Sequence, residues 1–242
     1  MVKKFILKNF IFVNLFLVIN AKDDQELALD YFMQGQFLLN QGNYAMAVIE
    51  FQDAILLDPN AITIHISLAD AYRRIGKVER ALDHLQIALD INPDDLEAMQ
   101  MLGKLYIAEN RIDEAENVFL SLSKLEPENL DHLYVLADIS KVKRKWSDAI
   151  DYYLNIYDQN PDITGVLQQA LQLSLTINDL SRSDEICELM LKNDPMNLDI
   201  LGTLKDIAIY NKNYQKAIQG LHRSNNDNHW TSRCNSTLSI RS

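Results

Sequence analysis

The side chains that could act as nucleophiles, proton carriers or metal ligands are scattered through this 242-residue chain. Its five histidines never fall at metal-ligand spacing with acids on one short helix face. Its two cysteines cannot form a disulfide framework or a four-cysteine zinc site. The sequence also lacks a phosphate-binding glycine loop, a dinucleotide fingerprint, a zinc-protease motif and a C-x-x-C pair. We therefore expect a protein that is not an enzyme, with no catalytic residue, no metal and no cofactor.

The amino-acid composition of the chain indicates which class of partner it can bind. Acidic residues number 34 against 23 Lys and Arg, which gives a net charge of −11. Such a surface offers no electrostatic support for binding a phosphate backbone, so we expect no nucleic-acid partner. An apolar fraction of 48% is too high for a wholly disordered chain, and only 7 Gly and 5 Pro argue against a turn-dense all-β fold.

An internal repeat of 34 residues organises the chain. The prolines all keep this interval: Pro59, Pro93, Pro127, Pro161 and Pro195. A series of small residues keeps it too: Ala47, Ala81, Ala115, Ala149, Ser183 and Ala217. A third series is mostly bulky: Phe51, Leu85, Phe119, Tyr153, Cys187 and Leu221. Because one such repeat cannot bury its own apolar face, the repeats must stack on one another.

Within each period the pattern is that of two helices. Leu68, Tyr72 and Ile75 share one helical face, and a second stripe at helical spacing starts at Ala81. The turn between the two helices falls at Gly42, Gly76, Asn110, Arg144, Asn178 and Lys212. Gly and Asn tolerate the left-handed conformation that ends a helix, so we expect the turns at Arg144 and Lys212 to differ from the others.

Small residues recur where the two helices of a pair should cross. On the first helix they are Gly35, Ala69, Gly103 and Ala137. The series of small residues that includes Ala115 lies opposite them on the second helix. A larger side chain at this crossing would force the two helices apart. Leu171 and Lys205 interrupt the first-helix series, so we expect the last two repeats to be looser or tilted. Cys187 and His65 stand in apolar series and are expected to be packing residues.

These spacings resemble the tetratricopeptide repeat (TPR) family. The second repeat carries the family pattern as His65, Leu68, Ala69, Tyr72, Ala81, Leu85, Ala88 and Pro93. The resemblance covers about residues 28–221 and implies an all-α fold, a right-handed α-solenoid of helix-turn-helix repeats. The expected repeats, five complete and one partial, span residues 28–61, 62–95, 96–129, 130–163, 164–197 and 198–221.

The resemblance also implies a concave groove lined by the first helix of each repeat. Carried over position by position, the expected peptide-binding residues are Phe32, Gln36, Ile66, Asp70, Arg73, Gln100, Lys104, Tyr134, Asp138, Lys141, Gln168 and Gln172. Amides, charges of both signs and a few apolar side chains suit an extended or helical peptide of a protein partner. The carboxylate clamp of the chaperone-binding members finds no match in any register of this chain.

The two ends of the chain depart from the repeat. Lysines precede an apolar run over residues 10–19, which predicts a signal peptide over residues 1–21 or, alternatively, a membrane anchor over residues 5–21. Either reading places the folded part outside the cytoplasm, in the periplasm or cell envelope, with residues 22–27 as a linker. Residues 222–242 read as a disordered or truncated tail, and the uncapped end before it could support self-association.

Two functions remain open at this point. The first is a non-catalytic scaffold that binds peptides or proteins in a cell-envelope assembly, with membrane contact only through an uncleaved N-terminal segment. The second is the non-catalytic TPR arm of a larger enzyme, such as a glycosyltransferase or peptidase, whose catalytic domain lies outside this chain.

Overall fold

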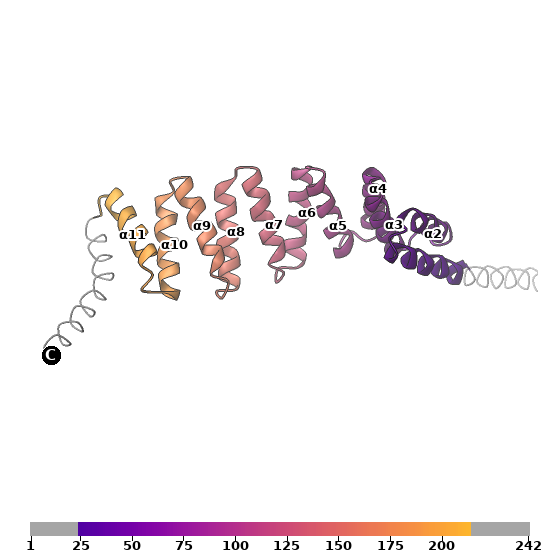
Figure 1. Cartoon of the computed structure of the whole chain (residues 1–242), viewed down its shortest axis with the longest axis horizontal. Helices are drawn as coiled ribbons and strands as arrows, with labels where there is room; N and C mark the ends of the chain where they lie inside the picture. Colours follow the sequence, from indigo (N-terminus) through magenta and orange to yellow (C-terminus); the bar gives the residue numbers. More distant parts are fainter. Residues whose placement is uncertain (1–23, 214–242) are drawn as a thin grey trace, which may run out of the picture. The chain divides into compact units, whose positions relative to one another are not determined.

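The computed structural model describes residues 24–213, which are helical apart from short turns. Residues 24–40 form the first helix. The others are α2 (Tyr44–Leu57), α3 (Ile62–Arg74), α4 (Val78–Ile91), α5 (Leu96–Ala108), α6 (Ile112–Leu125), α7 (Asp131–Val142), α8 (Trp146–Gln159), α9 (Gly165–Thr176), α10 (Leu180–Asn193) and α11 (Leu198–Tyr210) (Figure 1). The expected linker is therefore helical from residue 24. The predicted signal or anchor segment and the tail lie outside the described residues.

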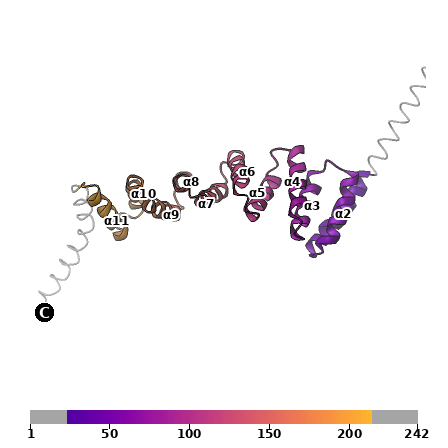
Figure 2. The ribbon, with the colours of Figure 1, turned by 90° about the horizontal axis from the view of Figure 1, so that it is seen from above.

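The chain divides into two compact units, residues 1–126 and residues 127–242. In the first unit, α2 packs on α3, α3 on α4, α4 on α5 and α5 on α6. In the second unit, successive helices from α7 to α11 pack in the same way. Each unit is thus a row of antiparallel helical hairpins (Figures 1 and 2). The expected fold class, an all-α solenoid of helix-turn-helix repeats, is confirmed.

All six turns that follow the first helix of a repeat adopt the same left-handed geometry. The turn residues Gly76 and Arg144 have φ angles of 75° and 57°, and Lys212 also has 57°. The expectation that Arg144 and Lys212 would turn differently is wrong. In each case the turn N–H bonds the carbonyl three residues back, and the next N–H bonds the carbonyl five residues back, as from Lys145 to Ser140 at 2.8 Å. These bonds satisfy the last carbonyls of the helix and hold a non-glycine residue in a strained conformation.

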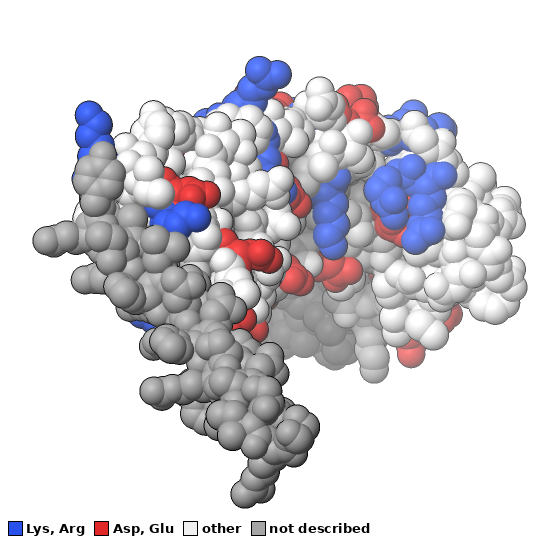
Figure 3. All heavy atoms as spheres, turned by 60° about the vertical axis from the view of Figure 1, so that its left-hand side comes forward, with Lys and Arg blue, Asp and Glu red and all other residues white. Residues whose placement is uncertain are grey.

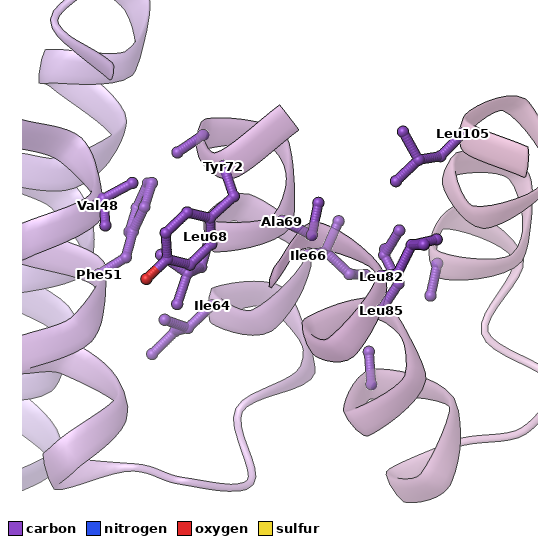
Figure 4. Packing of buried hydrophobic residues seen from close by; sticks show 14 of the residues in the cluster. Val48, Phe51, Ile64, Ile66, Leu68, Ala69, Tyr72, Leu82, Leu85 and Leu105 are labelled. Carbon is purple, nitrogen blue, oxygen red and sulfur yellow. The ribbon is translucent and has the colours of Figure 1, made fainter. Parts of the chain in front are cut away.

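The core of the first unit lies on both sides of α3. Figure 4 shows Phe51 of α2 meeting Leu68 and Tyr72 from one side, while Leu82 and Leu85 of α4 approach Ala69 from the other. The small residues of the second helices are fully buried, as expected: Ala47, Ala81, Ala115, Ala149 and Ser183.

Two glycines are required by close packing. A Cβ atom built on Gly35 would lie 2.5 Å from a ring carbon of Phe51, and one on Gly103 would lie 2.8 Å from a ring carbon of Phe119. Each first-helix glycine is therefore matched to a large ring sixteen residues later, because the helices of one hairpin cross there.

The fifth repeat reverses this order of sizes. Leu171 takes the place of the glycines and is 7% exposed, while Cys187 takes the place of the rings and is fully buried. A large residue on the first helix opposite a small residue on the second keeps the summed volume of the two side chains. Protein cores tolerate such volume-conserving exchanges well. The interruption at Leu171 is thus compensated within its own hairpin, and the predicted role of Cys187 as a packing residue is confirmed.

Candidate functional site

The groove residues expected from the sequence fall into both units. Those of the first unit lie in the first helix, α3 and α5, and those of the second unit lie in α7 and α9. Ile66 is 4% exposed and belongs to the hydrophobic core, against which Phe32 and Met101 pack. An aliphatic side chain gains free energy when neighbours remove it from water, so we correct the groove set by leaving Ile66 out.

Three of the expected residues line one hollow in the first unit. This first hollow measures about 580 Å³ and is formed by the end of α3, the start of α4 and one face of α5. It brings together Arg73, Gln100 and Lys104. The other lining residues were missed from the sequence: Val78, Glu97, Met101, Leu105, Ala108 and Glu109. Most of them share the α5 face of Gln100 at helical spacing, which is the signal that could have found them.

A carboxylate holds Arg73 at the edge of the first hollow. Arg73 Nε donates to Asp70 Oδ1 at 3.1 Å, and Arg74 Nε donates to Asp70 Oδ2 at 2.8 Å. Partial burial acts to raise the pKa of Asp70, but hydrogen bonds from Arg74 and Arg73 outweigh it, so this pKa lies below its usual value. Arg74 also lies 5.3 Å from the centre of the Tyr44 ring. Two guanidinium groups face one carboxylate, which leaves this edge positively charged.

The middle of the hollow carries an ammonium group with no ion-pair partner among the described residues. Lys104 is exposed, and Gln100 donates to Glu126 at 3.4 Å. Glu97 and Glu109 line the two ends of the same helix. The hollow therefore has a cationic centre between acidic ends, above apolar residues such as Leu105. Figure 3 shows that blue and red atoms also lie side by side on the surface it displays.

Two expected groove residues near the N-terminus are held by the fold and do not line the hollow. The Phe32 ring lies 5.9 Å from that of Phe51, and Gln36 Nε2 donates to Ser67 Oγ at 2.6 Å. Both side chains are half-buried: Phe32 packs within the first hairpin, and Gln36 links that hairpin to α3.

In the second unit, the expected residues comprise a paired cluster, a half-buried tyrosine and two exposed amides. Lys141 Nζ lies 2.6 Å from Asp138 Oδ1 and 3.0 Å from the Tyr153 hydroxyl. The hydrogen bond to Asp138 is the main reason that the pKa of Lys141 is raised. Tyr134 is half-buried on the same helix, while Gln168 and Gln172 of α9 are exposed.

Histidines pair in the core of the first unit. His65, predicted to be a packing residue, is 3% exposed, which confirms the prediction. Its Nε2 lies 3.0 Å from the Pro59 carbonyl oxygen, and its Nδ1 lies 3.1 Å from His84 Nδ1. Since a carbonyl only accepts, His65 carries its proton on Nε2, and His84 must donate from Nδ1.

Two properties of the described part bear on chemistry and on membrane contact. Among residues 24–213, no group of three or more His, Cys, Asp or Glu side chains could hold a metal ion. Within the same range, no helix combines the length and apolar character needed to cross a bilayer.

The chain is similar in sequence to two proteins that are named as assembly proteins. The chain is 26% identical over 216 residues to lipopolysaccharide assembly protein B of Escherichia coli K12. The matched region covers 84% of this chain and 55% of that protein. It is 34% identical over 103 residues to photosystem I assembly protein Ycf3 of Synechococcus sp. CC9311, covering 41% of this chain and 58% of that protein. The chain thus spans little more than half the length of these relatives.

Solved structures share the fold. MamA protein superposes with a TM-score of 0.57 at 17% identity, covering 70% of this chain and 93% of that one. A tetratricopeptide repeat protein from Parabacteroides merdae gives 0.58 at 15% identity, covering 82% and 78%. Models of the tetratricopeptide repeat match residues 32–95 and residues 76–139. With its 34-residue period, its hairpins and these matches, the chain belongs to the tetratricopeptide repeat family.

Proposed function

We propose that this protein is a non-catalytic scaffold whose first unit binds an extended, acidic peptide segment of a protein partner in the first hollow. The observation that carries the proposal is the convergence of Arg73, Gln100 and Lys104 on one hollow with an apolar floor. The tetratricopeptide repeats themselves support an interaction scaffold.

The charge of the hollow supports an acidic side chain at its centre. Lys104 has no ion-pair partner within residues 24–213, so an incoming carboxylate gains an ion pair without displacing any of these residues. Arg73 is oriented in advance by Asp70, which lowers the entropy lost on binding. The amide of Gln100 can pair with a peptide backbone, and Met101 offers apolar contact to a neighbouring side chain.

The place of action is proposed from the sequence and from one relative. We infer that the chain is exported and serves a cell-envelope assembly, either after cleavage of residues 1–21 or while anchored by residues 5–21. The apolar run of residues 10–19 and the likeness to lipopolysaccharide assembly protein B support this. Alkaline phosphatase fused after residue 40 should be active in bacterial cells, and an inactive fusion would place the chain in the cytoplasm.

Self-association through the C-terminal end stays a prediction.

Charge reversal at Lys104 tests the binding proposal. The full chain is applied to an array of short synthetic peptides that differ only in a central glutamate or glutamine. We expect the glutamate peptides to be retained better, by about fivefold, since a partly exposed ion pair contributes up to about 1 kcal/mol. Lys104→Glu should abolish this preference.

A matched variant separates the hollow from the overall charge. Lys124→Glu makes the same change at an exposed position of α6 that does not line the hollow, so it should keep the preference. Equal retention of both peptides by the unchanged protein, or equal loss in both variants, would contradict the proposal.

A further inference from the structure

A second hollow, in the second unit, lies at positions of the repeat equivalent to those of the first hollow. It measures about 260 Å³ and is formed by the end of α9, the start of α10 and one face of α11. Its lining includes Leu175, Leu180, Thr203, Asp206, Ile207 and Tyr210. Each of these lies three periods of 34 residues after a lining residue of the first hollow. The repeat thus places a hollow at equivalent positions in both units, although the second is less than half the size of the first.

The charges of the two hollows are opposite at equivalent positions. The ammonium of Lys104 in the first hollow is replaced by the carboxylate of Asp206 in the second. The guanidinium of Arg73 is replaced by the aliphatic side chain of Leu175. Among the described residues that line the second hollow there is no Lys or Arg, so these residues are anionic where the first hollow is cationic at its centre.

An aromatic ring stands one helical turn from this carboxylate. Tyr210 takes the position of Ala108 and is 69% exposed, and the Asp206 side chain is 73% exposed. Asp206 Oδ1 lies 3.3 Å from Nζ of its neighbour Lys205, an exposed pair that contributes little free energy. A carboxylate and an exposed ring at i and i+4 of α11 suit a cation, because both attract positive charge.

We propose that the second hollow binds a lysine or arginine side chain of a protein partner, with Asp206 as the counter-ion and Tyr210 as the aromatic wall. Leu175 and Leu180 contact the aliphatic stem of that side chain, as long basic residues bury their methylene groups against apolar surface. This inference rests on the proposed scaffold function and adds a second site of opposite charge preference.

Lysine-centred and glutamine-centred peptides on the same kind of array test the second site. The full chain should retain the lysine peptides about fivefold better than the glutamine peptides. Asp206→Asn and Tyr210→Ala should each reduce that preference, and Asp206→Lys should abolish it. Asp158→Lys makes the same charge change at an exposed position of α8 outside the hollow and should leave the preference intact.

The outcomes separate this inference from the proposed function. If Lys104→Glu removes glutamate binding while all Asp206 and Tyr210 variants keep lysine binding, the second site is wrong and the scaffold stands. If lysine binding depends on Asp206 but glutamate binding does not depend on Lys104, the second site stands and the first is wrong. If the unchanged protein prefers neither peptide, both are overturned.

Discussion

At the scale of single residues, the turns show how backbone hydrogen bonds override residue preference. Arg144 occupies the same left-handed conformation as Gly76, although its side chain costs about 1–2 kcal/mol there. Its N–H still bonds the Lys141 carbonyl at 3.0 Å, the bond that Gly76 makes to Arg73. The position was predictable from the 34-residue period, but the geometry at Arg144 was not, since residue preference argued against it.

This strain predicts a stabilising substitution. Arg144→Gly should raise the stability of the second unit by about 1 kcal/mol, because glycine adopts the left-handed conformation freely. Urea denaturation followed by circular dichroism measures it, as a higher midpoint.

The reverse change serves as the control. A Cβ atom on Gly76 would meet no atom within 4 Å, so Gly76→Arg tests the backbone cost alone and should lower the stability of the first unit by a similar amount. If Arg144→Gly leaves the midpoint unchanged or lowers it, the turn is not strained.

At the scale of helices, the packing of α3 against α4 creates a pH-sensitive contact. His84 stacks on Tyr72, with ring centres 5.6 Å apart, and its Nδ1 lies 3.1 Å from Nδ1 of the buried His65. Burial lowers the pKa of His84 most, and repulsion from His65 and Arg80 adds to the effect, while Asp83 opposes it.

The sign of the pH dependence follows from this shift. Between its lowered pKa in the folded state and the ordinary value near 6.5, His84 binds a proton more readily in the unfolded chain. The stability that neutral His84 gives to the folded state is therefore present above about pH 6.5 and is lost as the pH falls below that value. Urea midpoints measured from pH 7.5 to 5.5 should fall for the unchanged protein and fall less for His84→Gln. Equal slopes for the two proteins would show that His84 does not titrate in this range.

The helix pattern also shows where sequence reasoning about the site reached its limit. The family resemblance placed Arg73 and Lys104 in one expected groove, and both line the first hollow. It could not show that Ile66, at an equally outward position, is covered by its neighbours. Nor could it show that Leu171 would be balanced by Cys187, since that depends on the match of volumes across a helix crossing.

At the scale of the whole molecule, the periodic sequence and the contacts in the structure divide the chain differently. The repeat runs unbroken through Pro127, whose equivalents occur in every period, so the pattern gives no sign of a boundary there. The contacts nevertheless separate two compact units between Glu126 and Pro127. The closeness of packing between neighbouring repeats depends on their individual side chains. The 34-residue pattern contains only what the repeats share, so it does not reveal this difference.

The two hollows illustrate the same principle for function. The repeated backbone places a hollow at equivalent positions in both units, while the residues at these positions, such as Lys104 and Asp206, are free to differ. Family membership predicts that such surfaces exist, and the individual side chains determine what each one binds.

Site-specific photocrosslinking tests the central claim most directly, because it reports where a bound peptide lies. A benzoylphenylalanine placed at Met101, which lines the first hollow, should crosslink to a glutamate-centred peptide. The same probe at Asn117, an exposed position of α6 outside the hollow, should not. Equal crosslinking from both positions, or crosslinking from Asn117 alone, would contradict binding in the first hollow.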